Sequence, residues 1–377
     1  MRAKIMLIGL GDLGGVLLDL MLRMPEAVEV VVGTRNLARD QLRCRLSQLA
    51  AEGQGSLSRV RAVALDLTNV EGTAATLAKE SPDLVLSTAT MATWWLPDLL
   101  PPKEAKAIHQ AGFGVWLPCH LAPTLLLMQA VREANYRGHV LTAPYPDVVN
   151  YSLGQVELAP TCGIGNVAEI VAKIHSRAAE KLSGERSQVE VSLVAHHALV
   201  HYAYAHEGWS DTQDIPPFML SVRYQGRQVV DEIDGRALLF APEPMAQGRV
   251  THLLTASLTI PLVRAFMSQS PVALHAPGVH GLPGGYPVLV SEAGVVLNLK
   301  EKDREQAIAI NQRAQRYDGI ESVVNDGTVI LKEANASRLR ELIGYCPERI
   351  VLSEVQEQAT ELVRAYREFA KQKGVKS

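Results

Sequence analysis

The chain opens with an apolar run, a cluster of glycines and an apolar helical stretch, and this order constrains the fold more than any other feature. Residues 4–8 (KIMLI) are rich in strand formers, and residues 16–24 have the composition of a helix. Between them Gly9, Gly11 and Gly14 have the spacing G-x-G-x-x-G. The first glycine permits a tight turn, the second lets the backbone approach a pyrophosphate, and the third lets helix and strand pack closely. The sequence therefore predicts a dinucleotide-binding unit here.

Length and charge narrow the class of protein. A chain of 377 residues with a net charge of −3 is long enough for two domains and gives no reason to expect nucleic acid as a partner. No apolar run reaches the roughly 18 residues of a spanning helix, so we expect no membrane segment. The first residues lack a signal-peptide pattern, and the four cysteines stand far apart without a C-x-x-C pair. We expect no disulfide framework and no structural zinc site, and we expect a cytoplasmic location.

Strands and helices alternate from residue 4 to about residue 150. Short apolar runs predict strands, with helical segments between them, at residues 28–33, 61–66, 83–87, 114–117 and 139–142. This alternation is typical of a doubly wound, largely parallel sheet. We therefore expect an α/β fold in which residues 1–150 form a dinucleotide-binding domain of the Rossmann type. Its ligand belongs beyond the carboxyl ends of the strands.

The end of the second strand bears on the choice of cofactor. Proteins that bind NAD usually carry an acidic residue there, which holds the ribose 2′-hydroxyl. This chain has Thr34, Arg35 and Asn36 at that point, and Arg39 follows one helical turn later. A 2′-phosphate needs cations and donors, and a carboxylate would repel it. The sequence favours NADP over NAD, the alternative being that both arginines are solvated surface charges.

The strand ends and the loops after them supply the predicted cofactor site. Asp66 ends the third predicted strand, where it can contact the adenine end or simply serve a turn. The loop after the fourth strand is expected to run under the nicotinamide ribose. The residues predicted to bind the cofactor are Gly9, Gly11, Asp12, Leu13, Gly14, Thr34, Arg35, Asn36, Asp66, Thr88, Ala89 and Pro144.

Residues 151–377 are predicted to form an α+β domain for substrate binding and catalysis. Apolar periodicity indicates helices at residues 167–182, 249–267, 303–316 and 354–371, a strand at 189–194, and hairpins at 219–230 and 281–299. The two last helices are expected on the outside. The helix at 249–267 is apolar on one face, as a core helix or a subunit contact would be, and we expect a homodimer.

This order of elements resembles the superfamily that joins lactate and malate dehydrogenases to the NAD-dependent family 4 glycoside hydrolases. Three places carry the likeness: Gly9-x-Gly11-x-x-Gly14, residues 143–149 (APYPDVV), and the late helix with the hairpin at 286–290 (YPVLV). The match follows the chain in order through most of residues 1–320. A more distant dehydrogenase of the saccharopine or opine type is the alternative.

Two departures from that superfamily bear on the substrate. The lactate-type enzymes place an arginine in the loop after the fourth strand, where residues 92–98 (ATWWLPD) contain none. They also carry Asp-x-x-Arg before the histidine strand, and the corresponding run here, residues 166–171 (NVAEIV), has neither residue. A 2-hydroxy acid needs a guanidinium for its carboxylate, so the ordinary lactate or malate reaction is not expected.

The glycosidase branch holds a metal ion with a cysteine and a histidine. Cys162 is displaced by three residues from the position of that cysteine, and a buried apolar role suits it better. We therefore predict no metal ligand.

Histidines after the strand at 189–194 are the candidates for proton transfer. The resemblance places the catalytic histidine where His196 and His197 stand, with His197 preferred. His201 follows four residues later, and on a helix it would share a face with His197 as a second metal ligand could. His206 completes the cluster, and a structural role is the alternative for each of them.

Further polar and aromatic residues have two interpretations. Asn166 could bind a substrate hydroxyl or cap a helix, and Asp147 could orient the histidine, although a helix cap is favoured for it. Trp94 and Trp95 could stack on a substrate or fill an interface. The remaining candidates for reaching the site are His120 and His280.

The sequence as a whole indicates an NADP-dependent oxidoreductase for a small-molecule substrate, with His197 as acid and base. Two alternatives stay open at this point. One is an NAD(P)- and metal-dependent glycosidase that acts by transient oxidation of a sugar, and the other is a non-catalytic NADP-binding redox sensor.

Overall fold

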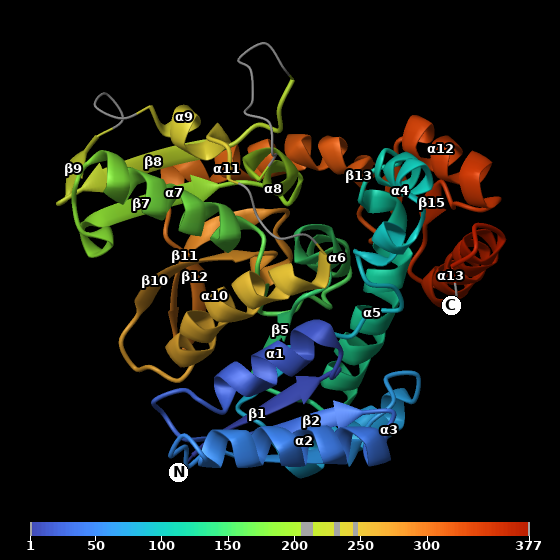
Figure 1. The fold of residues 1–377 in the computed structure, drawn as a ribbon, viewed down its shortest axis with the longest axis horizontal. Coiled ribbons are helices and arrows are strands. Elements are labelled where there is room, and N and C mark those ends of the chain that lie inside the picture. Colours follow the sequence, from blue (N-terminus) through green and yellow to red (C-terminus); the bar gives the residue numbers. More distant parts are fainter. Residues whose placement is uncertain (1, 205–213, 230–233, 244–247, 376–377) are drawn as a thin grey trace.

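A six-stranded parallel sheet organises the first half of the molecule. The computed structural model describes residues 2–204, 214–229, 234–243 and 248–375. In the sheet the strands follow the order β3-β2-β1-β4-β5-β6. Figure 1 labels β1, β2 and β5 of this sheet. The strands are β1 Ala3–Ile8, β2 Val28–Thr34, β3 Arg59–Ala64, β4 Leu84–Ser87, β5 His139–Thr142 and β6 Cys162–Gly163.

Helices cover both faces of this sheet, which confirms the doubly wound prediction. Side chains of β1 alternate between the faces: Ile5 and Leu7 join the core under α1, while Met6 and Ile8 join the core under α5. The helices of this half are α1 Asp12–Met21, α2 Leu37–Glu52, α3 Val70–Glu80, α4 Pro102–His109, α5 Leu117–Glu133 and α6 Pro146–Gly154.

The second half adds three small antiparallel sheets and more helices, as expected of an α+β region. The strands are β7 Val189–Val194, β8 Met219–Tyr224, β9 Arg227–Gln228, β10 Val272–Pro277, β11 Gly285–Ser291, β12 Gly294–Leu297, β13 Ile320–Val323, β14 Val329–Leu331 and β15 Arg349–Ile350. The helices are α7 Val167–Lys181, α8 Ala198–Ala203, α9 Gly235–Phe240, α10 His252–Ala265, α11 Glu301–Ala314, α12 Glu333–Ile343 and α13 Val355–Gln372.

The strand predicted at residues 114–117 is wrong. A short 3₁₀ turn, Gly114–Trp116, stands there and leads directly into α5. The residues are apolar because they are buried on all sides, and a short buried run does not distinguish strand from helix. The sixth strand is β6, which lies beyond residue 150 and pairs with β5. The division of domains at residue 150 stays a prediction.

One helical segment, Gly114–Glu133, is long and apolar enough to cross a membrane by length and composition alone. Of its most apolar stretch, 83% is buried inside the protein, as in the core helix of a globular fold. Its side chains pack against α3 and α13. The apolar character of this helix is therefore explained by the core that it fills.

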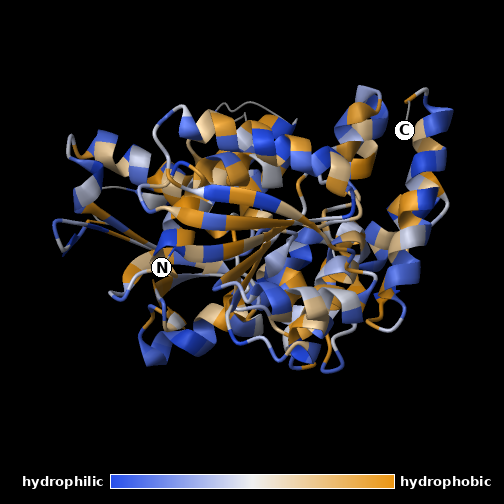
Figure 2. Cartoon of the chain, turned by 90° about the horizontal axis from the view of Figure 1, so that it is seen from below, coloured by the Kyte–Doolittle hydropathy of each residue, from blue (hydrophilic) through white to orange (hydrophobic). Residues whose placement is uncertain are grey.

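The C-terminal region returns to the first half and closes one side of it. Helix α13 packs along α5, and the Tyr366 hydroxyl donates to the carbonyl of Leu96 at 2.7 Å. Hydrophobic residues gather along the inner strands, and α13 near the C-terminus alternates hydrophilic and hydrophobic residues (Figure 2). Helix α10 packs on α1 through Ala256, Leu262 and Val263, while Leu253 is exposed. The predicted homodimer stays a prediction.

Candidate functional site

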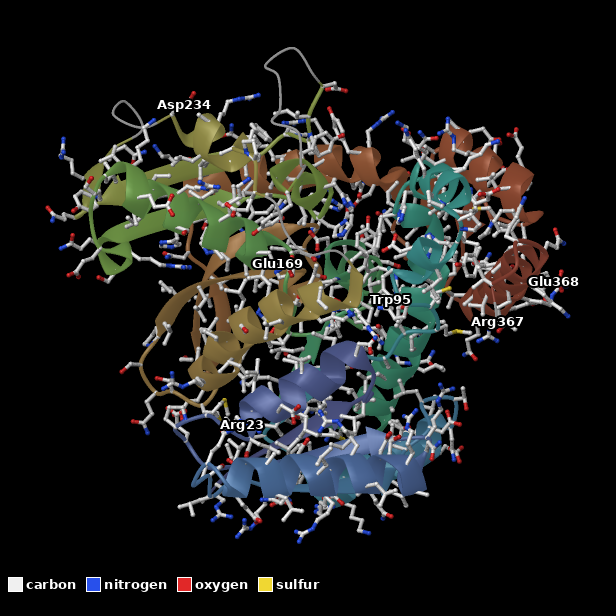
Figure 3. The ribbon with its side chains drawn as sticks, viewed as in Figure 1. Arg23, Trp95, Glu169, Asp234, Arg367 and Glu368 are labelled. Atoms are coloured by element: carbon white, nitrogen blue, oxygen red, sulfur yellow. The ribbon has the colours of Figure 1, made fainter. Side chains whose placement is uncertain are left out.

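A cavity of about 1860 Å³ opens at the carboxyl ends of the parallel strands. Every residue predicted to bind the cofactor lines it, and so do Asn166 and His197. The cavity continues between α7, α8 and α10 on one side and reaches α13 on the other. Figure 3 shows Glu169 and Arg367, which line it from α7 and from α13. The structure thus brings the two halves of the predicted site into one space.

The glycine turn has the geometry that the sequence argument requires. Gly9 has a φ of +93°, which an L side chain rarely adopts. A Cβ on Gly14 would stand 2.1 Å from the Gly9 carbonyl oxygen, so only glycine lets α1 lie this close. A Cβ on Gly11 would meet nothing within 4 Å. The space beside Gly11 and the first amides of α1, which have no side-chain cap in the described structure, suit a pyrophosphate.

Two arginines lie at the end of β2: Arg39 is paired with a carboxylate, and Arg35 has no ion pair among the described residues. The Arg39 Nε donates to Asp40 at 2.7 Å, and the Thr34 hydroxyl also donates to that buried carboxylate. Arg35 is exposed, lines the cavity, and has no ion pair recorded among the described residues. Asn36 caps α2 by accepting from the Arg39 amide at 3.2 Å. Arg35 is therefore the guanidinium available to a ligand at this end.

Two further strand ends complete this side of the cavity. The Thr88 hydroxyl donates to the Gly9 carbonyl at 3.0 Å and ties the loop after β4 to the glycine turn. The Asp66 carboxylate accepts from the amide and the hydroxyl of Thr68 at 3.0 and 2.8 Å. Asp66 thus serves its local turn, as the sequence alternative held, while it also lines the cavity.

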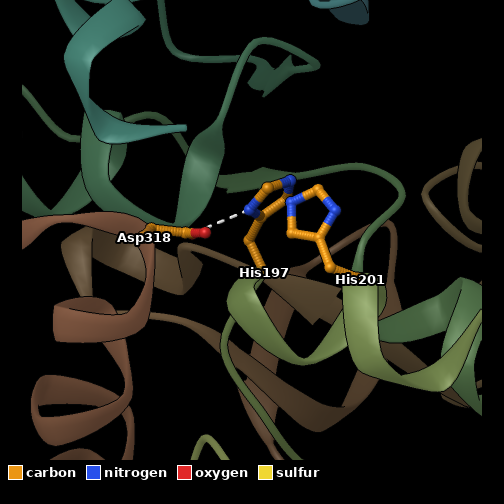
Figure 4. Close-up of side chains that lie close together, drawn as sticks. All are labelled: His197, His201 and Asp318. Atoms are coloured by element: carbon orange, nitrogen blue, oxygen red, sulfur yellow. Dashed lines mark hydrogen bonds and ion pairs between the residues drawn. The ribbon is translucent and has the colours of Figure 1, made fainter. Parts of the chain in front are cut away.

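His197 is held by two carboxylates from distant parts of the chain. Its Nδ1 lies 2.7 Å from an Asp318 oxygen (Figure 4), and the same oxygen accepts the Tyr145 hydroxyl at 2.9 Å. The backbone amide of His197 donates to Asp147 at 2.7 Å. Because a carboxylate only accepts, the proton between ring and carboxylate belongs to Nδ1. The other ring nitrogen, Nε2, is therefore the one left for a ligand, and the residue lines the cavity.

The electrostatics of this pair favour its charged form. Burial opposes charge on His197, but the attraction and hydrogen bond of Asp318 outweigh it, and the pKa of His197 is raised. Burial likewise opposes charge on Asp318, yet His197 holds the pKa of that carboxyl well below its usual range. Burial raises the pKa of Tyr145 well above its ordinary value, so its hydroxyl remains a donor. The arrangement stabilises an imidazolium.

The helix cap predicted for Asp147 is wrong. Its side chain lies in the first turn of α6 but accepts from the His197 amide and from the Asn166 side chain. Asn166 occupies the N-cap position of α7 with a φ of +50° and makes no side-chain cap bond. Asp147 therefore positions two cavity residues, because its buried carboxylate finds its donors across the domain rather than in its own helix.

His196 does not reach the cavity, although it adjoins the pair. Its ring is buried, its Nδ1 accepts from the Ala198 amide at 3.2 Å, and the same atom lies 3.5 Å from Asp318. Its Nε2 is buried without a partner among the described residues. His196 is not among the residues that line the cavity, so a role in direct proton exchange with a substrate does not fit it.

His201 lies beside His197 on α8, with ring centroids 5.1 Å apart. His197, His201 and Asp318 each offer a ligand atom, and these atoms lie within 4.8 Å of one another. Cys162 is buried in β6, burial raises the pKa of its thiol to about 12, and it does not line the cavity. His206 lies outside the described residues.

Of the four other candidate residues, two line the cavity and two do not. Trp94 and His120 line it, and His120 is buried against Phe113, with ring centroids 5.6 Å apart. Trp95 does not line it. The His280 Nε2 donates to the Val295 carbonyl at 2.9 Å, and the side chain stays outside the cavity. The candidate role of His280 in the site does not fit, because its turn has a φ of +48° and its ring bonds to β12 instead.

Sequence reasoning missed Asp318, Tyr145 and the cavity face of α13. Tyr145 stands inside the segment at 143–149 that carried the resemblance, so a signal for it was present. Asp318 follows α11 in a region without a recognisable motif. Its partner His197 is 121 residues away in the chain. Only folding brings them together.

Comparison with known proteins supports the fold. No family model matches the chain, and no curated protein matches it in sequence. Among solved structures, a malate dehydrogenase from Cryptosporidium parvum is 16% identical, with a TM-score of 0.55 over 84% of this chain and 98% of that one. A lactate dehydrogenase from Eimeria maxima, solved with NADH and oxamate, is 12% identical, with a TM-score of 0.54 over 84% and 93%.

A lactate dehydrogenase from Cryptosporidium parvum, solved with lactic acid and nicotinamide adenine dinucleotide, is 16% identical with a TM-score of 0.52 over 84% of this chain and 98% of that one. The predicted likeness to lactate and malate dehydrogenases is thus confirmed for the fold. At these identities the likeness establishes the fold alone, and the glycosidase branch of the superfamily stays a prediction.

Proposed function

We propose that the protein is an NADP-dependent oxidoreductase that acts on a small substrate with His197 as acid and base. The observation that carries the proposal is the single cavity, which joins the glycine turn to the His197–Asp318 pair. A fold of this type binds its ligand at the carboxyl ends of the strands, where this cavity lies.

The residues of the cavity fit a dinucleotide. The open space at Gly11 and the uncapped start of α1 suit the pyrophosphate. The cavity that joins the glycine turn to His197 is also lined by Thr88 and Ala89, in the loop after β4, and by Pro144. When bound, the nicotinamide would accept a hydride from the substrate carbon or donate one to it.

His197 supplies the proton chemistry that accompanies this hydride. Its Nδ1 is fixed by Asp318, so Nε2 takes the proton of an alcohol in oxidation and returns it to a carbonyl in reduction. The buried carboxylate stabilises the imidazolium that forms in oxidation. Tyr145 and Asp147 fix the carboxylate and the backbone around the ring, so that the imidazole keeps one orientation.

Arg35 supports the preference for NADP over NAD. Among the described residues its guanidinium has no ion pair, whereas Asp40, the acidic residue nearby, is engaged by Arg39 and Thr34. A fluorescence titration should show tighter binding of NADPH than of NADH to the wild-type protein. Arg35→Asp should weaken NADPH binding by about tenfold or more and shift the preference toward NADH.

Arg137→Asp is the matched control, because Arg137 is exposed and does not line the cavity. It should leave both affinities unchanged. Equal affinity of the wild-type protein for the two nucleotides, or an unchanged preference in Arg35→Asp, would contradict the assignment to NADP.

A further inference from the structure

Glu169 is a carboxyl group of the cavity that the proposed mechanism does not use. It stands in the first turn of α7 and lies beside α10 (Figure 3). It lines the same cavity as His197. The Thr255 hydroxyl donates to its Oε1 at 2.6 Å, and the Tyr204 hydroxyl donates to its backbone carbonyl at 2.8 Å. Thr255 occupies one acceptor position, so the carboxyl group can still accept from a ligand.

Lysine and arginine are missing from this end of the described cavity, where His197 is the charged side chain that acts on Glu169. The guanidinium groups that line the cavity come from the β2–α2 turn (Arg35 and Arg39) and from α13 (Arg364 and Arg367). No lysine or arginine among the described lining residues comes from α7, α8 or α10. The internal stretches outside the described residues, 205–213, 230–233 and 244–247, contain neither residue type in the sequence.

A carboxylate without lysine or arginine beside it binds hydrogen-bond donors and cations, whereas a guanidinium binds acceptors and anions. A carboxylate substrate placed against ionised Glu169 would meet electrostatic repulsion. A hydroxyl or ammonium group would donate to it. Burial raises the pKa of Glu169, while the Thr255 hydrogen bond and the charge of His197 act in the opposite direction. A substrate cation bound beside Glu169 would likewise favour its ionised form.

We propose that Glu169 binds the substrate and selects one that carries a hydrogen-bond donor, a hydroxyl or an ammonium group, next to the carbon that exchanges hydride. Glu169 stands where the resemblance to the lactate-type enzymes places an arginine, so the polarity of the subsite is reversed. Asn166, held by Asp147, lies one helical turn before it and lines the same region. This inference rests on the proposed function and names its substrate class.

Three probes that differ in one group test the proposal: 1-amino-2-propanol, 1,2-propanediol and lactate. Each carries the same secondary alcohol beside an ammonium, a hydroxyl or a carboxylate. Oxidation of each removes a hydride, which NADP⁺ accepts, and the hydroxyl proton, which His197 accepts, and leaves the ketone. The measurements are the KM and kcat of this oxidation and the dissociation constant of each probe from the complex with NADPH.

The wild-type protein should bind the ammonium or the hydroxyl probe at least about tenfold more tightly than lactate. Glu169→Gln should weaken the ammonium probe more than the hydroxyl probe, which tells the two donors apart. Glu169→Arg should reverse the order and favour lactate. Glu180→Arg is the control, because Glu180 is exposed on the same helix and does not line the cavity.

The titration with NADPH separates this inference from the proposed function. If the wild-type protein and both Glu169 variants bind NADPH equally, the fold and cofactor site are intact in all three. In that case, any of three results would overturn the inference. The wild type could bind lactate most tightly, it could bind none of the probes, or Glu169→Arg could leave the order of the probes unchanged. Failure of the wild type to bind NADPH would overturn the proposed function itself.

Discussion

The carboxylate of Asp318 is buried, accepts from His197 and Tyr145, and has His196 3.5 Å away. A buried carboxylate is costly unless donors and a cation surround it. Here His197 provides the cation, and Asp318 makes the largest favourable contribution to the charged form of His197. The acid–base character of His197 is therefore set by a residue 121 positions further along the chain.

Asp318→Asn should lower the pKa of His197, which is otherwise raised above its ordinary value of about 6.5, because burial is then opposed only by the attraction of Asp147 and Glu169. In the wild-type protein the midpoint should lie above that value. Titration of the His197 ring by NMR measures both. A midpoint that is the same in the variant would show that Asp318 does not control this histidine.

The same pair makes stability depend on pH. Because the pKa of His197 is raised by folding, its contribution is fully present below the unfolded value of about 6.5 and is lost as pH rises through the folded value. The difference in free energy of unfolding between wild type and His197→Gln should therefore shrink as the pH rises through that window. Urea unfolding at a series of pH values measures it, and a difference that grows would contradict the raised pKa.

At the scale of elements, the unit β1–turn–α1 does two separate jobs with its glycines. Gly14 allows the helix to approach the turn, and Gly11 leaves room for a ligand. Both follow from local backbone geometry, which is why the sequence alone predicted this unit. The strand predicted at 114–117 failed for the opposite reason: its burial comes from Asp318, Ile320 and α13, which are distant in the chain.

Substitutions at these two glycines should separate folding from binding. Gly14→Ala brings a Cβ to 2.1 Å from a backbone oxygen and should destabilise the protein by about 1–3 kcal/mol. Gly11→Ala meets nothing within 4 Å, so it should keep the stability of the wild type and weaken NADPH binding. Thermal unfolding and nucleotide titration of both variants test this, and equal effects of the two on stability would contradict it.

At the scale of the whole molecule, the C-terminal region belongs to the first core. Leu362, Tyr366 and Phe369 of α13 are buried in the same cluster as α3 and α5. The helix at 354–371 was predicted well from its period. Its place against α5 was not predictable, because an amphipathic helix shows that it packs but not against what. The strands β13 to β15 are too short to show a periodic pattern, so the sequence did not predict them.

Leu362→Ala should destabilise the whole protein by about 2–5 kcal/mol, since it opens a cavity between α13 and α5. The loss should appear in a single unfolding transition that the nucleotide site shares. Chemical unfolding followed by circular dichroism, with and without NADPH, measures it. Separate melting of α13 with an unaltered nucleotide site would show that the two regions are independent.

The most direct measurement is a crystal structure of the protein with NADP⁺. The account predicts the pyrophosphate beside Gly11, the 2′-phosphate at Arg35, and the nicotinamide C4 facing His197 Nε2 across the space lined by Glu169. A nucleotide bound elsewhere, or a nicotinamide directed away from His197 while the glycine turn is occupied, would contradict it.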